Sequence, residues 1–251
     1  MPIEPATELL IDLGNSRLKW ALWSPERLHV AVPIEPVNGT YTELQPLIAA
    51  ASVTHGARIC STAGAVADAL YWQLAKILAQ PLQVFISPAS GLGVVNGYAQ
   101  PERLGSDRYL AMAAARACTH GAYLVADAGT ALTLDLVDAQ GRHQGGQIIP
   151  GPALMRDSLH RGTAAVRSET QAQVQCFARS TTDAVWSGAI FTCAAAIDVS
   201  LRLAAKQLDA PVSLLLCGGA APLLLPHLES PARHCPDLVL QGLAIWAAVQ
   251  H

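Results

Sequence analysis

The chain has 251 residues, of which 51% are hydrophobic and 14% are charged, and its formal net charge is −3. This composition provides enough apolar material for a sizeable core and excludes intrinsic disorder. With 16 Lys and Arg residues against 19 Asp and Glu residues, the overall charge gives no reason to expect a nucleic acid or a membrane surface as partner.

Targeting signals and membrane spans are not expected either. The first residues, MPIEPATE, place acids and prolines where a secretory signal needs a basic stretch followed by an apolar one. The longest apolar runs, 122–137 and 211–225, are interrupted by aspartates in the first and by glycines and a proline in the second. No C-x-x-C pair occurs, so we expect a cytoplasmic protein with reduced, mostly buried cysteines. These are Cys60, Cys118, Cys176, Cys193, Cys217 and Cys235.

The first predicted element is a β-hairpin over residues 9–22. An apolar strand runs up to Asp12, a tight turn of the form Asp-x-Gly-Asn follows, and the next residues alternate with period two. Further along, the pattern predicts short strands at 58–61 and 82–86 and a helix at 63–79.

Two glycine-containing stretches precede the middle of the chain. Residues 91–97 resemble a dinucleotide-binding fingerprint, but the third glycine comes one residue late and Pro101 stands where a helix should run, so we discount this interpretation. The loop 96–108 then leads into an alanine-rich helix at 109–118. Ser106 is a candidate N-cap for that helix.

Asp107 and Arg108 allow two interpretations. An acid in the first turn of a helix is favoured by the helix dipole, so capping is the simpler role of Asp107. A carboxylate beside an arginine can also deprotonate a substrate hydroxyl while the arginine holds a substrate anion.

A second hairpin repeats the first. Residues 124–137 align without gaps with residues 9–22, so that Asp12 falls on Asp127 and Gly14 on Gly129. A duplicated unit that mixes hairpins with β-α-β crossovers predicts an α/β protein of two similar domains. We expect mixed sheets flanked by helices, a cleft between the domains, and domains that span residues 1–118 and 119–251.

The rest of the chain supplies helices at 182–208 and 238–249 and a strand at 212–217. The turns at 145–152 and 216–220 are rich in glycine, which suits either close approach to a nucleotide or simple turn formation. Pro152 suits the first turn of a helix. Thr181 or Thr182 can either cap the long helix or point into the cleft.

Two acidic turns facing each other across a cleft suit a nucleoside triphosphate. Backbone N–H groups at the glycines can approach phosphate oxygens, Asn15, Ser16 and Thr130 add donors, and the two aspartates can carry cations. Other phosphate, zinc and hydrolase motifs are absent from the sequence: it has no G-x-x-x-x-G-K-[ST], no H-E-x-x-H and no G-x-S-x-G.

Over essentially its whole length the chain resembles the type III pantothenate kinases, which belong to the actin-like ATPase and sugar-kinase superfamily. Four motifs carry the resemblance: DLGNSRLK at 12–19, GYAQP at 97–101 with LGSDR at 104–108, DAGTALTLD at 127–135, and GGQIIPG at 145–151. Ser16 stands where many relatives have Thr, a change that keeps the hydroxyl.

The resemblance implies a reaction and a set of roles. ATP, with Mg²⁺, would phosphorylate pantothenate to 4′-phosphopantothenate in a homodimer whose substrate pocket lies at the subunit interface. Asp107 would be the catalytic base, and Asp127 would bind a monovalent cation, K⁺ or NH₄⁺. The implied ATP contacts are Asp12, Leu13, Gly14, Asn15, Ser16, Arg17, Leu18, Lys19 and Thr130. The implied pantothenate contacts are Tyr98, Gly105, Ser106, Asp107, Arg108 and Thr182.

Two alternatives remain at this stage. A kinase of the same superfamily could act on an acyl phosphate, a sugar or polyphosphate, since a fold does not determine its substrate. The chain could also be a non-catalytic regulator that keeps the fold. Intact Asp12, Asp107, Arg108 and Asp127 argue against that, and the net charge gives no sign of DNA binding.

Overall fold

The computed structural model describes residues 7–14, 16–36, 41, 43–61, 70–72, 74–76, 82–162 and 172–250. Most of the helix expected at 63–79 lies outside these ranges. Contacts divide the chain into two units, one formed by Met1–Cys118 with Asp237–His251 and the other by Thr119–Pro236.

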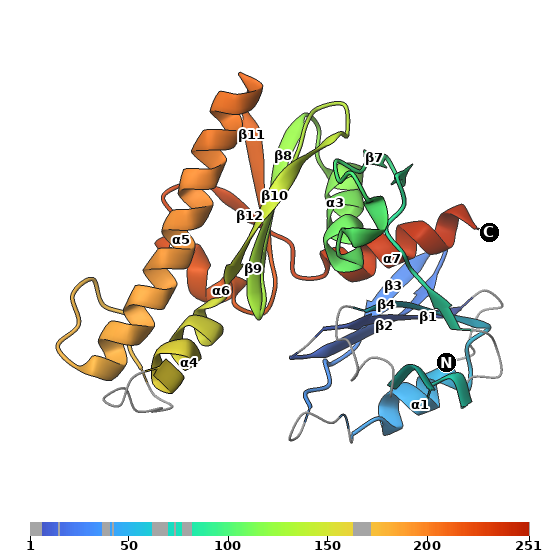
Figure 1. Cartoon of the computed structure of the whole chain (residues 1–251). Coiled ribbons are helices and arrows are strands. Elements are labelled where there is room, and N and C mark those ends of the chain that lie inside the picture. Colours follow the sequence, from blue (N-terminus) through green and yellow to red (C-terminus); the bar gives the residue numbers. More distant parts are fainter. Residues whose placement is uncertain are drawn as a thin grey trace. The chain divides into compact units, whose positions relative to one another are not determined.

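The first unit contains a five-stranded mixed sheet with strand order β3-β2-β1-β4-β5 (Figure 1). The hairpin expected at 9–22 is confirmed, because β1 pairs antiparallel with β2 while β4 and β5 add on in parallel. The strands are β1 (Glu8–Leu13), β2 (Leu18–Ser24), β3 (Arg27–Val30), β4 (Gly56–Ser61) and β5 (Leu82–Val84).

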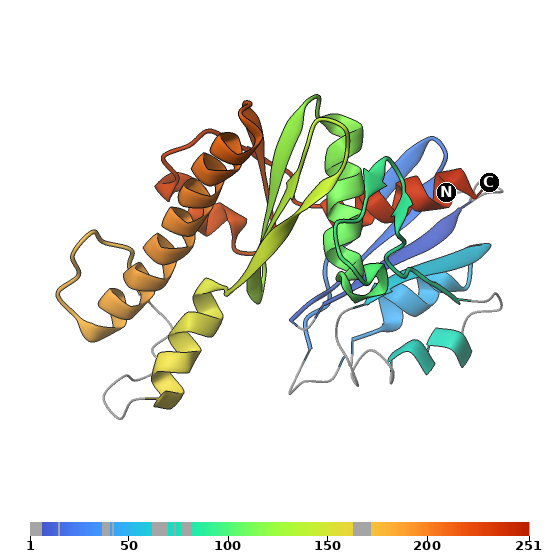
Figure 2. The same ribbon diagram turned by 45° about the horizontal axis from the view of Figure 1, so that its top comes forward.

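Helices cover both faces of this sheet. Leu9, Ile11 and Leu13 of β1 point to one face and pack with Leu47 of α1 (Gln45–Ala51). Figure 2 shows α3 (Ser106–Cys118) and α7 (Leu238–Val249) crossing on the other face. At their crossing, a Cβ on Gly242 would lie 2.3 Å from the carbonyl oxygen of Leu110, so a glycine permits this close approach.

The position of α7 corrects the expected domain division. We expected residues 119–251 to form the second domain, but Asp237–His251 belongs to the first unit. The reason is hydrophobic: α7 carries buried apolar side chains along its length, and it buries them against α3 and the sheet of the first unit.

A buried arginine ties the end of α7 to this sheet. Arg58 of β4 donates to both carboxylate oxygens of Glu8, at 2.5 and 3.1 Å, and to the amide oxygens of Gln83 and Gln250, each at 2.7 Å. Its guanidinium also lies 4.8 Å from the ring centroid of Trp246. The charge is therefore neutralised and hydrogen-bonded, as a buried charge requires.

The second unit repeats the topology of the first, with strand order β10-β9-β8-β11-β12 and the same parallel and antiparallel pairings. The expected α/β class with two similar units is confirmed. Its strands are β8 (Ala122–Ala128), β9 (Ala131–Val137), β10 (His143–Pro150), β11 (Val212–Cys217) and β12 (Ala232–His234), and its helices are α4 (Pro152–Gly162), α5 (Thr181–Leu208) and α6 (Ala221–Leu224).

The two hairpins differ by one residue, which corrects the gapless alignment. Leu13 pairs with Leu18 around the first turn, whereas Ala128 pairs with Leu132 around the second. The first turn is therefore one residue longer. Asp12 and Asp127 still correspond, but Lys19 corresponds to Thr133, the residue opposite Asp127.

Helix α5 supplies much of the core of the second unit. Ile190, Cys193 and Ile197 pack against apolar side chains of β8, β9 and β11. By length and composition α5 could cross a membrane, and 39% of its most apolar window is buried. Sequence reasoning did not single it out as a candidate span. The packing in the structure shows this helix covering one face of the sheet (Figure 1).

Cysteine burial follows the expectation in part. Cys60, Cys193, Cys217 and Cys235 are buried, Cys118 and Cys176 are exposed, and all six are free.

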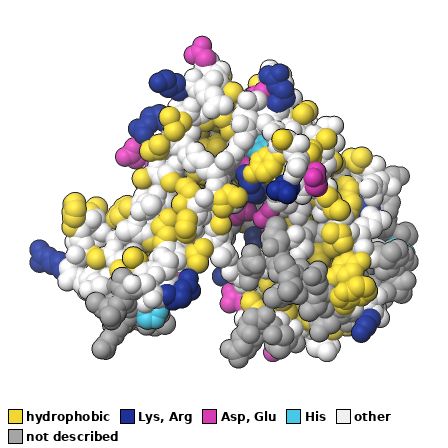
Figure 3. Space-filling view, in the orientation of Figure 1, with side chains coloured by type: hydrophobic (Ala, Val, Ile, Leu, Met, Phe, Trp, Pro, Cys, Tyr) yellow, Lys and Arg dark blue, Asp and Glu magenta, His cyan; other side chains and the backbone are white. Residues whose placement is uncertain are grey.

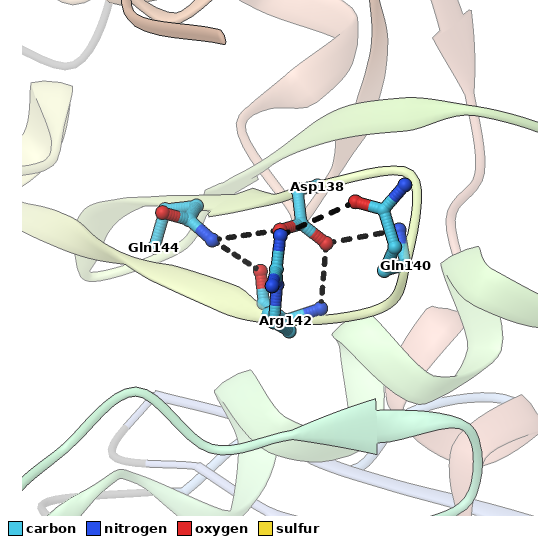
Figure 4. Close-up of polar contacts among 4 residues, drawn as sticks. All are labelled: Asp138, Gln140, Arg142 and Gln144. Carbon is cyan, nitrogen blue, oxygen red and sulfur yellow. Dashed lines mark hydrogen bonds and ion pairs between the residues drawn. The ribbon is translucent and has the colours of Figure 1, made fainter.

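The turn between β9 and β10 is organised by one carboxylate (Figure 4). Asp138 accepts hydrogen bonds from the backbone N–H groups of Gln140 and Arg142, both at 2.9 Å, from Arg142 Nε at 2.7 Å and from Gln144 Nε2 at 2.9 Å. Burial alone would raise the pKa of Asp138, but these hydrogen bonds and the charge of Arg142 outweigh it and lower the pKa.

Replacing Asp138 with Asn is expected to destabilise the protein by about 1–3 kcal/mol at pH 7, because charge-assisted hydrogen bonds are lost. Because folding lowers the pKa of Asp138, its charge stabilises the folded protein at every pH above the unfolded pKa, near 3.8. This stabilisation is lost as the pH falls through the lower pKa of the folded state. Urea unfolding at pH 7 and below pH 4 checks this.

Asp157→Asn, which removes one charge of the half-buried Arg156–Asp157 ion pair, is the control and should change stability by less than about 0.5 kcal/mol. An equal loss in D138N at both pH values would contradict the prediction.

Candidate active site

Asp12 lies at the carboxyl end of β1, where open α/β sheets bind their ligands. It pairs with Lys19 across the hairpin and with Cys60 on the parallel neighbour β4. The turn after it closes with a 3.0 Å hydrogen bond from Gly14 N to the carbonyl oxygen of Arg17. Tyr41 Oη donates to the carbonyl oxygen of Gly14 at 3.1 Å and holds the turn from outside the hairpin.

The pKa values of Tyr41 and Cys60 respond to the carboxylates at this end of the sheet. Burial and the negative charge of Asp12 raise the pKa of Tyr41. Burial, Asp12 and Asp107 together raise the pKa of Cys60 well above its usual value. Asp12 and Asp107 therefore both act electrostatically on Cys60, from either side of it in sequence. Sequence reasoning missed Tyr41 and Cys60, because neither belongs to the motifs of the hairpin or the Gly-Ser-Asp-Arg loop.

The residues of the expected ATP-phosphate loop divide by burial. Leu13 and Leu18 are fully buried in the core of the first unit, so they offer the loop their backbone alone. Ser16 and Arg17 are exposed and Lys19 is half-buried. Arg17 forms an exposed ion pair with Glu35 at 3.0 Å. Asn15 lies outside the described residues.

The first turn of α3 contains Asp107. The helix starts one residue earlier than a Ser106 N-cap would require: Tyr109 N donates to the carbonyl oxygen of Gly105 at 3.1 Å, so Gly105 precedes the helix and Ser106 is its first residue. The N-cap interpretation of Ser106 is therefore wrong. Its hydroxyl lies 3.2 Å from Cys60 Sγ and 3.4 Å from the carbonyl oxygen of Ser61.

The Asp107 carboxylate accepts a hydrogen bond from the backbone N–H of Arg108 at 2.8 Å. Asp107 therefore does cap a first-turn N–H group of α3, and the same hydrogen bond holds one of its carboxylate oxygens in place. A Cβ on residue 105 would lie 2.6 Å from that same oxygen, Oδ1. Glycine at position 105 leaves the space that the Asp107 carboxylate occupies.

Arg108 is buried and is held by the loop that precedes α3. Its Nη1 donates to Tyr98 Oη at 2.9 Å, and its guanidinium lies 5.7 Å from the Tyr98 ring centroid. Asn96 fixes that loop, since its amide donates to the carbonyl oxygens of Pro88 and Pro101 and its oxygen accepts from Tyr98 N. Tyr98, Gly105, Asp107 and Arg108 are therefore linked by hydrogen bonds and close packing, and their role as substrate contacts stays a prediction.

The stretch that resembled a dinucleotide fingerprint is a small hairpin, β6 (Ser90–Gly91) and β7 (Val94–Val95). Its turn residues Leu92 and Gly93 both have positive φ, 51° and 78°, as in the tight turns that match strand twist. Tyr109 Oη donates to the carbonyl oxygens of Gly91 and Val94 at 2.8 and 2.9 Å. These glycines serve turn geometry, which confirms that the fingerprint was rightly discounted.

In the second unit, three glycine-containing turns meet around Asp127 and Gly129. Gly151 N donates to the carbonyl oxygen of Thr130 at 2.9 Å, and a Cβ on Gly151 would lie 2.3 Å from the carbonyl oxygen of Gly129. Gly218, with φ +87°, approaches so closely that a Cβ there would lie 2.4 Å from Asp127 Oδ1. The turns at 145–152 and 216–220 therefore both pack against the Asp127 hairpin, and a part for either of them in nucleotide binding stays a prediction.

The N-terminus of α5 removes the capping interpretation of Thr182. The N-cap is Ser180, whose Oγ accepts from Asp183 N at 3.1 Å and donates to Asp183 Oδ2 at 2.7 Å. Thr181 and Thr182 are therefore first-turn residues. Neither hydroxyl is needed for the cap, and the substrate role of Thr182 stays a prediction.

Cation binding would rest on single carboxylates. Among the described residues, no group of three or more His, Cys, Asp or Glu side chains could hold a metal ion. Asp12 and Asp127 each lie at a strand end beside a glycine turn, and the carbonyl oxygen of Ala128 lies near Asp127. Such a site suits cations that take part of their coordination from a substrate phosphate or from water.

Comparison with known proteins assigns the family. The model of the type III pantothenate kinase family matches residues 8–202. A protein of that description from Xylella fastidiosa (strain M23) is 40% identical over 243 residues, covering 96% of this chain and 97% of the relative. Another from Laribacter hongkongensis (strain HLHK9) is 35% identical over 236 residues, covering 94% and 96%.

A structural comparison supports the fold. A Sinorhizobium meliloti protein, provisionally assigned as a 2-dehydro-3-deoxygalactonokinase, superposes with a TM-score of 0.59 at 17% identity, covering 97% of this chain and 96% of that one. At this identity the likeness concerns the fold alone, which is the two-unit fold of actin-like ATPases and sugar kinases. With the family model covering most of the sequence and both relatives aligned over nearly their full length, this chain belongs to the type III pantothenate kinase family.

Proposed function

We propose that the protein transfers the γ-phosphoryl group of ATP to the terminal hydroxyl of pantothenate, giving 4′-phosphopantothenate and ADP at the start of coenzyme A synthesis. One observation carries the proposal beyond family membership. The Asp107 carboxylate is fixed at the start of α3, next to the buried Arg108–Tyr98 pair, in a unit that also contains the Asp12 turn.

Each of these residues has a step in the reaction. Arg108 binds the pantothenate carboxylate, with Tyr98, Gly105, Ser106 and Thr182 as further substrate contacts. Asp107 accepts the proton of the attacking hydroxyl on its carboxylate. That hydroxyl oxygen forms the new bond to the γ-phosphorus, while the bond from the γ-phosphorus to the bridging oxygen breaks and its electron pair leaves with ADP. Positioning and charge compensation supply most of the catalysis in such transfers.

ATP contacts are proposed for the first hairpin, from Asp12 to Lys19 (Leu13, Gly14, Asn15, Ser16, Arg17 and Leu18 included), and for Thr130 of the second. Asp12 would hold Mg²⁺ together with the phosphates, and Asp127 would hold K⁺ or NH₄⁺. When bound, these cations supply positive charge to the phosphate oxygens. The carboxylate oxygens present are ligands that such cations prefer, which supports this part of the proposal.

We further propose a cytoplasmic homodimer with no nucleic-acid or membrane partner. Support for the dimer comes from α5, whose outer side carries exposed apolar residues such as Val199 and Leu203. Hydrophobic side chains are visible over this part of the surface in Figure 3. A self-complementary apolar helix face is a common dimer interface.

The testing experiment is ATP-dependent phosphorylation of pantothenate by the purified protein in K⁺, in NH₄⁺ and in Na⁺ alone. We expect product in K⁺ or NH₄⁺ and a rate lower by about tenfold or more in Na⁺, with the difference abolished in Asp127→Asn. Equal rates in all three salts would contradict the role of Asp127. No product in any salt from folded protein would contradict the kinase assignment, and a panel of sugar and acyl acceptors would then identify another substrate.

A further inference from the structure

The first turn of α3 is joined to the end of β4 by a contact that the reaction above does not use. Ser106 Oγ lies 3.2 Å from Cys60 Sγ and 3.4 Å from the carbonyl oxygen of Ser61. Both side chains are buried, with Ser106 8% exposed and Cys60 not exposed at all. A serine hydroxyl that donates to the Ser61 carbonyl can accept from the Cys60 thiol, so a single orientation satisfies both groups.

This contact lies next to both acids of the proposed reaction. Cys60 is directly opposite Asp12 in the parallel pairing of β1 with β4, and side chains at paired positions point to the same face of a sheet. Ser106 immediately precedes Asp107 in the first turn of α3. Cys60 and Ser106 are therefore each adjacent to one of the two acids.

We propose that Ser106 and Cys60 are positioning residues for the general base. They fix the first turn of α3 on the end of β4 and thereby fix the Asp107 carboxylate relative to Asp12. The inference rests on the proposed function, and it changes the part that Ser106 plays. Its buried hydroxyl is directed at β4, so it acts on the reaction through Asp107, and the pantothenate contact proposed above for Ser106 is left to its backbone.

Other contacts of this turn hold it in different directions. Gly105 and the Arg108 N–H set the carboxylate orientation within the turn itself, and the Arg108 guanidinium ties the turn to the loop containing Tyr98. Ser106 instead joins the turn to the strand paired with β1, which carries Asp12. Loss of the Ser106 contact with β4 should therefore shift the Asp107 carboxylate while leaving the hydrogen bond between Arg108 and Tyr98 in place.

The test compares Ser106→Ala, Cys60→Ala, their double variant and Cys60→Ser in the full-length protein, with steady-state kinetics for pantothenate and ATP. Each alanine variant should lower kcat about tenfold and leave the KM for pantothenate within about threefold, as for a misplaced catalytic group with intact binding. The double variant should also lose about tenfold and not about a hundredfold, because the two residues form one contact. Cys60→Ser keeps a hydroxyl donor and should stay within about twofold of the parent.

Ser87→Ala is the matched control. Ser87 is a buried serine of the same unit, and among the described residues its hydroxyl has no hydrogen-bond partner. Its kcat should be unchanged. Melting curves confirm that each variant is folded; if Cys60→Ala is not, Ser106→Ala and Cys60→Ser still decide, since neither opens a large cavity.

Three results would overturn the inference: a kcat for Ser106→Ala as high as for Ser87→Ala, additive losses in the double variant, or a tenfold loss in Cys60→Ser. Activity of the parent protein on pantothenate with any of these outcomes would leave the proposed function standing. A parent protein that phosphorylates no pantothenate would overturn the proposed function, and the positioning role with it.

Discussion

Replacement of Asp107 by Asn is expected to lower kcat for pantothenate phosphorylation by about 10²- to 10⁴-fold, the usual contribution of a general base. The amide keeps an oxygen that can accept the 2.8 Å hydrogen bond from the Arg108 N–H, so the first turn of α3 should be retained. What is lost is the group that accepts the proton of the attacking hydroxyl. Steady-state kinetics with a melting curve for each protein measure both quantities.

The KM values give this prediction its specificity. Arg108 and Tyr98 remain in place, so the KM for pantothenate should change by less than about threefold. Asp157→Asn, at a half-buried aspartate of the second unit, serves as control and should retain full activity. A D107N enzyme with near-normal kcat would show that Asp107 caps the helix and does no more.

Replacement of Gly218 by Ala is expected to have the next largest effect, on stability and activity together. Gly218 has φ +87°, and an added Cβ would lie 2.4 Å from Asp127 Oδ1 and 2.5 Å from the backbone carbonyl of Ala128. The alanine must therefore distort the hairpin that contains Asp127, in addition to adopting an unfavourable backbone conformation. We expect a loss of about 1–3 kcal/mol of stability and of about tenfold or more in kcat/KM for ATP.

Gly188→Ala is the control for this substitution. Gly188 lies within α5, and a Cβ there would meet nothing within 4 Å. Alanine is a better helix former than glycine, so this variant should be unchanged or more stable by up to about 1 kcal/mol. Urea unfolding compares the stability of the two variants, and steady-state kinetics compare their kcat/KM for ATP. A G218A protein as stable and active as G188A would contradict the close packing of the 216–220 turn on Asp127.

The strands and long helices could be predicted because their signals are local. The two Asp-x-Gly hairpins, β11 and the helices α5 and α7 follow from hydrophobic period and turn residues within a short window. The place of α7 could not be predicted in this way. Its partner α3 is distant in sequence, and the apolar residue pattern of α7 does not predict which of two similar sheets the helix will cover.

The candidate site residues that could be predicted are those that belong to sequence motifs. Motifs named Asp12, Asp107, Arg108 and Asp127 as candidates, whereas Tyr41 and Cys60 were missed because tertiary packing brings them to the first hairpin turn and to Ser106. The Ser106 cap failed for a related reason. A serine before an acid resembles an N-cap in sequence, but a buried thiol on a neighbouring strand competes for its hydroxyl.

The return of α7 to the first unit also bears on the order of folding during synthesis. The second unit, Thr119–Pro236, is one continuous segment and can fold as soon as it leaves the ribosome. The first unit has to wait, since α3 and the sheet beneath it lack the apolar partner that covers them until residues 238–249 have been made. The older half of the nascent chain is thus completed last, and it is the half whose exposed apolar face a chaperone would shield in the interval.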